Sequence, residues 1–125
     1  MSAGERLPGA PEPSDWWEGE AGRIAGDRFG DRNGPLVVLQ HGGGQTRHAW
    51  RGVGQTLGDT GYDVVSIDAR GHGDSDWAPD GNYDRDLMVA DLVRVLEQLD
   101  AGPPVLVGAS MGGNTSLAAI GEGRV

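Results

Sequence analysis

Three short apolar runs alternate with helical patterns along the chain, and this order constrains the fold more than any other feature. The runs cover residues 36–39, 64–67 and 105–107, and each is rich in β-branched residues at successive positions. A strand that is buried on both faces of a sheet has this composition. Because helical patterns separate the runs, the order predicts parallel strands joined by right-handed crossovers. The sequence therefore predicts an α/β fold with flanking helices around a mostly parallel sheet.

The helical patterns differ in strength. Across residues 46–59, apolar side chains recur every four positions from Ala49 to Leu57, although the glycines of this stretch weaken a helix. Residues 82–100 show a clearer pattern, with charges on one helical face and apolar residues on the other. The apolar face comprises Met88, Leu92, Val95, Leu96 and Leu99. A third helix is expected directly after Ser110.

The N-terminal region carries weaker signals. Residues 1–19 are rich in Pro, Gly and acidic residues, which predicts a disordered tail, and residues 20–125 would then form a single domain. A weak alternation at Ile24 and Phe29 predicts a short antiparallel strand or hairpin ahead of the first apolar run.

Charge and composition exclude several functions. The formal net charge of −9 repels phosphate backbones and anionic lipids, so nucleic-acid and membrane partners are not expected. No apolar run approaches the ~20 residues of a membrane span, and the first 20 residues lack the apolar core of a signal peptide. The absence of cysteine excludes disulfides and thiolate–metal sites, and it fits the cytoplasm, where we expect the protein.

Ser110 lies among glycines between the third apolar run and the third helix. In a tight strand-to-helix turn, small neighbours let the two elements pass closely, and the serine hydroxyl stands exposed beside the first amides of the helix. That arrangement suits a nucleophile. The alternatives are a serine that merely caps the helix and a phosphate-binding loop. The second requires a lysine where this chain has Asn114.

Two further loops follow the other apolar runs. The glycines of residues 40–45 let backbone amides approach a ligand, and we expect the amides of Gly43 and Met111 to form an oxyanion hole. His41 is expected to bond nearby backbone. In residues 68–75, Arg70 could pair with Asp68 or Asp74 and fix the loop, and His72, which lies between two glycines, is expected to be structural. Asp74 and Asp76 are a weak metal signal, and no metal site is predicted.

Together the three loops resemble the α/β-hydrolase superfamily. HGGGQTRHAW (41–50) is similar to its oxyanion loop, SIDARGHGDS (66–75) to its D-x-R-G-x-G-x-S loop, and GASMGG (108–113) to its nucleophile elbow. The resemblance covers residues 20–125 and implies hydrolysis of a small-molecule ester or related acyl compound, with Ser110 as the nucleophile and no cofactor. The form of the elbow resembles the esterase and cofactor-free haloperoxidase branch. Epoxide hydrolases and haloalkane dehalogenases of this superfamily have Asp at that position.

The chain departs from the family pattern after the elbow. Family members supply the triad in the order serine, acid, histidine, but the 15 residues that follow Ser110 contain no histidine. We therefore expect an N-terminal part of the fold that is incomplete at its C-terminus and has little turnover on its own. Its strand at 105–107 would form an apolar edge that favours self-association. A recruited His41, His48 or His72, or a non-catalytic binding or interaction module, are the alternatives.

Overall fold

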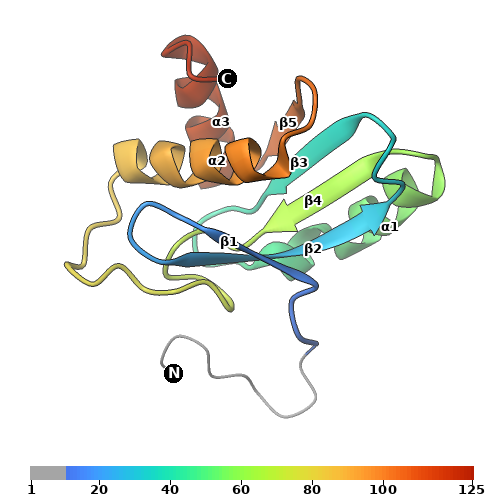
Figure 1. Ribbon diagram of the computed structural model, residues 1–125. Coiled ribbons are helices and arrows are strands. Elements are labelled where there is room, and N and C mark those ends of the chain that lie inside the picture. Colours follow the sequence, from blue (N-terminus) through green and yellow to red (C-terminus); the bar gives the residue numbers. More distant parts are fainter. Residues whose placement is uncertain (1–10) are drawn as a thin grey trace.

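The computed structural model describes residues 11–125 as a five-stranded sheet with helices on both faces (Figure 1). In chain order the strands are β1 (Asp15–Glu18), β2 (Arg23–Gly30), β3 (Leu36–Gln40), β4 (Asp63–Ile67) and β5 (Val105–Gly108). The helices are the 3₁₀ turn η1 (Arg47–Trp50), α1 (Arg51–Asp59), α2 (Arg85–Leu99) and α3 (Met111–Gly121). All three apolar runs are strands and all three helical patterns are helices, as the sequence predicts. None of the helices in this part of the chain has the length and apolar character to cross a membrane.

The sheet has the strand order β1-β2-β4-β3-β5 and is only half parallel. Strand β3 pairs in parallel with β4 and β5, whereas β2 pairs antiparallel with β1 and β4. The expected mostly parallel sheet is therefore wrong on one side. The reason lies in the connections: β1 and β2 are joined by a short turn, closed by a 2.7 Å hydrogen bond from Gly19 N to Gly22 O, and a parallel pairing needs a crossover of a dozen or more residues.

Strand β1 also corrects the predicted tail. Residues 15–18 pair with β2, and Trp17 is buried in the main core beside Ile24. The composition of the N-terminal stretch suggests disorder. The indole of Trp17 alone buries a large apolar surface, however, and the average composition does not reflect this. Residues 1–10 of the predicted tail lie outside the described part of the chain.

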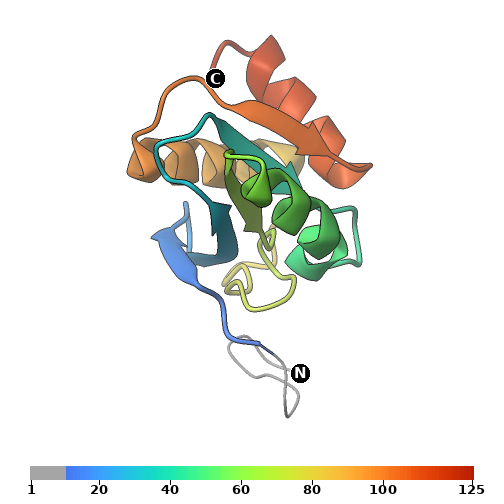
Figure 2. The same ribbon diagram turned by 90° about the vertical axis from the view of Figure 1, so that its right-hand side faces the viewer.

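Two apolar clusters cover the two faces of the sheet. The larger lies under α2 and α3 and includes Val38 and Val65 from the strands and Leu92 from α2. The smaller lies on the other face, where α1 packs (Figure 2), and contains Val37, Leu39 and Val64. Successive strand residues therefore alternate between two buried faces. This double burial explains why the sequences of β3 and β4 are continuous apolar runs.

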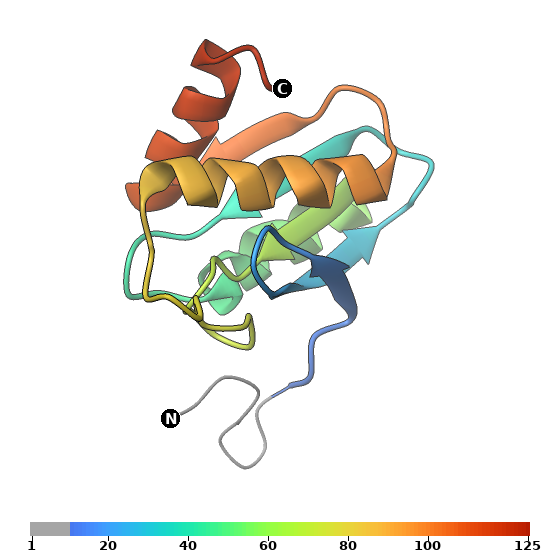
Figure 3. The ribbon, with the colours of Figure 1, turned by 60° about the vertical axis from the view of Figure 1, so that its left-hand side comes forward.

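Strand β5 forms one edge of the sheet, and α3 follows it directly (Figure 3). Val105 at the start of β5 is 55% exposed, and on α3 Leu117 is 71% and Ile120 is 55% exposed. An unpaired edge with apolar side chains around it is a template for pairing with another chain.

We propose that this edge makes the chain self-associate. The sedimentation coefficient should rise with protein concentration, because paired edges remove the exposed apolar side chains from water. A lysine on an edge strand opposes such pairing, so Val105→Lys should sediment as a monomer at concentrations at which the unaltered chain associates. An unaltered chain that stays monomeric throughout the concentration series would contradict the proposal.

Candidate active site

Ser110 lies at the junction of β5 and α3 in a strained backbone conformation, with φ 51° and ψ −108°. The positive φ is costly for a residue with a side chain, and such strain persists only where the surroundings enforce it. The residues around Ser110 are closely packed. A Cβ atom at Gly108 would collide with the backbone of α3 at Gly112, and a Cβ atom at Gly112 would collide with the backbone of Gln40. The small residues two positions either side of Ser110 thus allow the sharp turn.

The expected site residues come together around one surface depression of about 380 Å³. Its lining comprises Gly43, Tyr83, Arg85, Met88, Ser110, Met111, Asn114 and Thr115. Ser110 is exposed and its side chain makes no capping hydrogen bond to α3, so the capping interpretation is wrong. The hydroxyl of Thr115 donates to Met111 O, 2.9 Å away, within its own helix, which also disfavours a phosphate-binding loop.

The two amides expected to bind an oxyanion differ from the amide beside them. The amide of Gly42 donates to Gln45 Oε1 over 2.9 Å and is therefore occupied. Within residues 11–125, neither Gly43 N nor Met111 N has a hydrogen-bond acceptor. Both residues line the depression that holds Ser110. Two amides without an acceptor in residues 11–125 and an exposed hydroxyl therefore belong to residues that line the same depression.

His41 is a structural histidine, as the sequence suggests. It is 2% exposed, its Nδ1 lies 2.8 Å from Gly42 O, and its Nε2 accepts a hydrogen bond of 3.0 Å from Ala69 N. Burial lowers the pKa of His41, since a charged ring would lose its hydration, and the contact with Gly42 O opposes this only in part. The ring therefore joins two loops in its neutral form.

The lowered pKa predicts a loss of stability in mild acid. In the unfolded chain His41 has its ordinary pKa of about 6.5. Below that pH the unfolded chain binds a proton at His41, whereas the folded chain binds it only at a lower pH. The His41 contribution is thus complete above about pH 6.5 and falls as the pH approaches the lower folded pKa, by about 1.4 kcal/mol for each pH unit between the two values. Urea unfolding at neutral and mildly acidic pH measures it. A His48→Gln variant should keep this pH dependence; its loss there would contradict the assignment to His41.

His72 also bonds backbone, as expected for a structural residue. Its Nδ1 lies 3.0 Å from Arg70 O, and its Nε2 accepts a 3.1 Å hydrogen bond from Gly44 N. Neither His41, His48 nor His72 lines the depression around Ser110. The structure therefore does not bring a recruited histidine of this chain to the exposed hydroxyl.

Arg70 has a different partner from the ones expected. Its guanidinium makes two hydrogen bonds to Asp91 of α2, at 2.7 and 2.9 Å, and a third to Asn82 O at 3.1 Å. Hydrogen bonding to Asp91 raises the pKa of Arg70 above its ordinary value. The predicted pairing with Asp68 or Asp74 is wrong, because the Arg70 side chain extends to Asp91 of α2 and not along its own loop.

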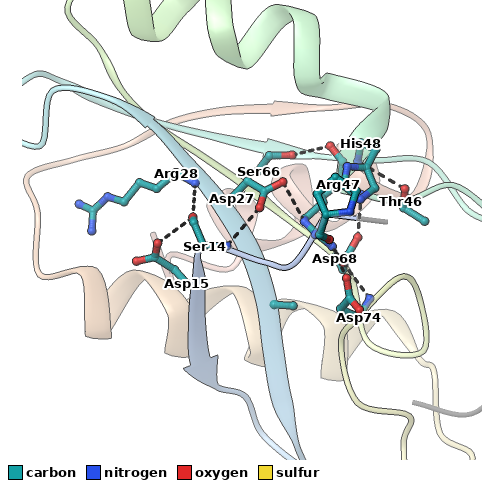
Figure 4. Close-up of polar contacts among 12 residues, drawn as sticks. Ser14, Asp15, Asp27, Arg28, Thr46, Arg47, His48, Ser66, Asp68 and Asp74 are labelled. Carbon is teal, nitrogen blue, oxygen red and sulfur yellow. Dashed lines mark hydrogen bonds and ion pairs between the residues drawn. The ribbon is translucent and has the colours of Figure 1, made fainter. Parts of the chain in front are cut away.

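Arg47, to which no sequence motif assigns a role, makes the contacts expected of Arg70 (Figure 4). Its fully buried guanidinium contacts carboxylates of Asp68 at 2.6 Å, Asp74 at 2.8 Å and Asp27 at 2.9 Å. Hydrogen bonds and charges of these carboxylates raise the pKa of Arg47 despite its burial. The signal in the sequence is slight: a single arginine just after a glycine-rich loop, with acidic partners far along the chain.

The two aspartates of the weak metal signal are both paired with arginines. Asp74 contacts Arg47, and Asp76 contacts Arg23 at 3.3 Å and accepts the amide of Arg23 at 2.8 Å. Among residues 11–125 no group of three His, Cys, Asp or Glu side chains is arranged to hold a metal ion.

The sequence of this chain is similar to those of known hydrolases. A model of the family described as the alpha/beta hydrolase fold matches residues 35–122. The chain is 40% identical over 98 residues to an esterase of Mycobacterium tuberculosis (Rv0045c), covering 78% of this chain and 32% of that protein. It is 39% identical over 89 residues to the mouse sn-1-specific diacylglycerol lipase ABHD11 (70% and 28%). Over 83 residues it is 39% identical to epoxide hydrolase B of Mycobacterium tuberculosis (66% and 23%).

Solved structures agree with these relatives. The thioesterase domain from the curacin biosynthetic pathway superposes with a TM-score of 0.80 at 28% identity, covering 93% of this chain and 44% of that one. An esterase from Exiguobacterium antarcticum gives 0.78 at 29% identity (88% and 40%), and an epoxide hydrolase from Vigna radiata gives 0.79 at 26% identity (88% and 36%). The chain thus spans a third or less of the three curated relatives and less than half of the three solved structures.

Proposed function

We propose that this chain, which belongs to the α/β hydrolase family, carries the nucleophile and the oxyanion hole of an enzyme that hydrolyses small esters or related acyl compounds. The observation that supports this most directly is the shared depression. The exposed Ser110, at its strained turn, lies there with Gly43 and Met111, whose amides are unoccupied within residues 11–125.

The chemistry follows from this arrangement. Ser110 Oγ attacks the acyl carbon, its proton passes to a general base, and the carbonyl oxygen becomes an oxyanion that accepts hydrogen bonds from Gly43 N and Met111 N. Collapse of this intermediate expels the alcohol or thiol, which takes the proton from the base. Water then attacks the acyl–serine ester by the same route and releases the acid.

The relatives of this chain include epoxide hydrolases as well as esterases and a lipase. The residue at the turn favours acyl chemistry. A serine that opened an epoxide would form an ether, which water does not readily cleave, whereas the ester formed by acyl transfer is hydrolysed through the same oxyanion hole. With a hydroxyl in place of a carboxylate at position 110, ester hydrolysis is the consistent reaction.

Unlike the nucleophile, a general base is absent from the lining of the depression in residues 11–125. No His, Asp or Glu side chain of residues 11–125 lines the depression, and both ring nitrogens of His41 and of His72 contact backbone. We therefore propose that the base is a histidine that these 125 residues do not supply. The chain alone should have little or no turnover, since loss of the base costs such enzymes several orders of magnitude.

Labelling of Ser110 by a fluorophosphonate in the presence of free imidazole tests both parts of the proposal. Imidazole can act as an external base, and the depression of about 380 Å³ has room for it. Mass spectrometry should find the phosphonyl group on Ser110, with a labelling rate that rises with imidazole concentration. The Ser110→Ala variant should remain unlabelled.

A Ser14→Ala variant is the matched control, because Ser14 is another serine of this chain and lies away from the depression. It should label like the unaltered chain. If the chain is folded and Ser110 stays unlabelled at high imidazole concentration, the assignment of Ser110 as the nucleophile is contradicted. The alternative of a non-catalytic binding module would then be favoured. Rapid ester turnover that needs Ser110 but not imidazole would contradict the missing base.

A further inference from the structure

The turn that carries Gly43 has little support from packing. Residues 42–45 close on themselves through hydrogen bonds from Gln45 N to Gly42 O (3.1 Å) and from Gly42 N to Gln45 Oε1 (2.9 Å). Gly43 and Gly44 are exposed, and a Cβ atom at either would meet nothing within 4 Å. Packing of side chains therefore does not determine the direction of the Gly43 amide.

Hydrogen bonds with two histidines hold the peptide units on either side of Gly43. Gly42 O, which shares a rigid peptide unit with Gly43 N, lies 2.8 Å from His41 Nδ1. In a trans peptide the N–H points away from the C=O, so Gly43 N–H is directed away from His41. The next unit ends in Gly44 N, which donates to His72 Nε2 over 3.1 Å.

His72 is suited to act as an acceptor at this place. Its Nδ1 lies 3.0 Å from Arg70 O, which can only accept, so Nδ1 carries the proton and Nε2 keeps its lone pair for Gly44 N–H. The loop beneath it is anchored, since Arg70 is paired with Asp91 of α2, and the His72 ring lies 5.0 Å from that of His41. Within the described residues, the bond from Gly44 to His72 is the one hydrogen bond that ties the backbone of Gly43 and Gly44 to the 68–75 loop.

We propose that His72 is a positioning residue of the active site, which holds the peptide unit after Gly43 and so directs the Gly43 amide toward the oxyanion. The proposal rests on the proposed function for the role of that amide. It assigns to the 68–75 loop a part in catalysis: the loop supplies an acceptor to the oxyanion turn without touching the substrate. An acceptor is required at position 72, but a histidine as such is not.

Two variants of the full chain test this assignment. His72→Gln keeps an acceptor within reach of Gly44 N–H, whereas His72→Leu removes it. Hydrogen exchange of the Gly44 amide, followed by NMR, should be slow in the unaltered chain and in the Gln variant and at least tenfold faster in the Leu variant. Imidazole-assisted labelling of Ser110 should slow about tenfold in the Leu variant and be restored in the Gln variant. Complete removal of one oxyanion-hole donor lowers the reaction rate about 10²–10³-fold, and a misdirected donor should lower it less.

The readouts separate the two proposals. A purely structural His72 would make the Gln and Leu variants equally defective, and equal Gly44 exchange in all three proteins would overturn the inference. If the Leu variant fails to fold, the ring tautomer of the unaltered protein decides. A proton on Nδ1 supports the inference, and a proton on Nε2 overturns it. Absence of Ser110 labelling in every protein, together with the expected exchange pattern, would reject the proposed function and retain the hydrogen-bond assignment.

Discussion

Replacement of Arg47 by methionine is expected to destabilise the chain by about 3–5 kcal/mol, a large part of the roughly 5–15 kcal/mol by which native domains are stable. The guanidinium is fully buried and contacts the carboxylates of Asp27, Asp68 and Asp74 at 2.6–2.9 Å. Methionine fills a similar volume but removes the guanidinium that these three carboxylates share. Removing one side of a buried ion pair is costly because the remaining charges cannot regain their hydration.

Urea unfolding followed by circular dichroism measures the loss, with Arg94→Met as the matched control. Arg94 also pairs with a carboxylate at 2.6 Å, but its side chain is 50% exposed and that of Glu20 is 40% exposed. An exposed pair contributes about 0–1 kcal/mol, so this control should unfold almost like the unaltered chain. Similar losses in the two variants would show that burial of Arg47 is not what makes its ion pairs important.

The elements and the loops at their ends could be predicted from the sequence because their signals are local. Apolar runs locate β3, β4 and β5 to within one residue, and β3 and β4 are buried on both faces, where few polar side chains are tolerated. The glycines around Ser110 indicate a tight turn because only small residues fit there. Parallel strands then bring their following loops to one edge of the sheet, where Gly43, Ser110 and Met111 line the same depression.

Partners that lie far along the chain could not be predicted in the same way. Arg47 and Arg70 look equivalent in the sequence, yet Arg47 takes the aspartates of the 68–75 loop and Arg70 takes Asp91 of α2. The choice depends on which guanidinium the folded backbone buries beneath the loop. The antiparallel hairpin predicted ahead of the first apolar run is confirmed by β1 and β2. Its extent into residues 15–18 could not be predicted for a related reason: Trp17 becomes a core residue only when β2 and α2 are in place around it.

Gly112→Ala and Gly113→Ala, neighbouring changes in α3, are expected to differ in their effects on stability, with only Gly112→Ala destabilising. Alanine favours a helix interior by about 1 kcal/mol over glycine, so both changes gain at most this amount in the first turn of α3. At position 112, however, the added Cβ would collide with Gln40 O and lie 2.7 Å from Gln40 C. Gln40 ends the buried strand β3, so its backbone cannot move aside, and overpacking of this kind costs about 1–3 kcal/mol or more.

At position 113 the nearest atom to an added Cβ is Gly108 O at 3.2 Å, which a shift of a few tenths of an ångström relieves. Urea unfolding should therefore show Gly113→Ala equal to or more stable than the unaltered chain and Gly112→Ala less stable. Equal stabilities would contradict the close approach of α3 to β3. The same collision would push the start of α3 away from the sheet, and with it Met111 N. Gly112→Ala should therefore slow imidazole-assisted labelling of Ser110 even where the chain remains folded, whereas Gly113→Ala should not.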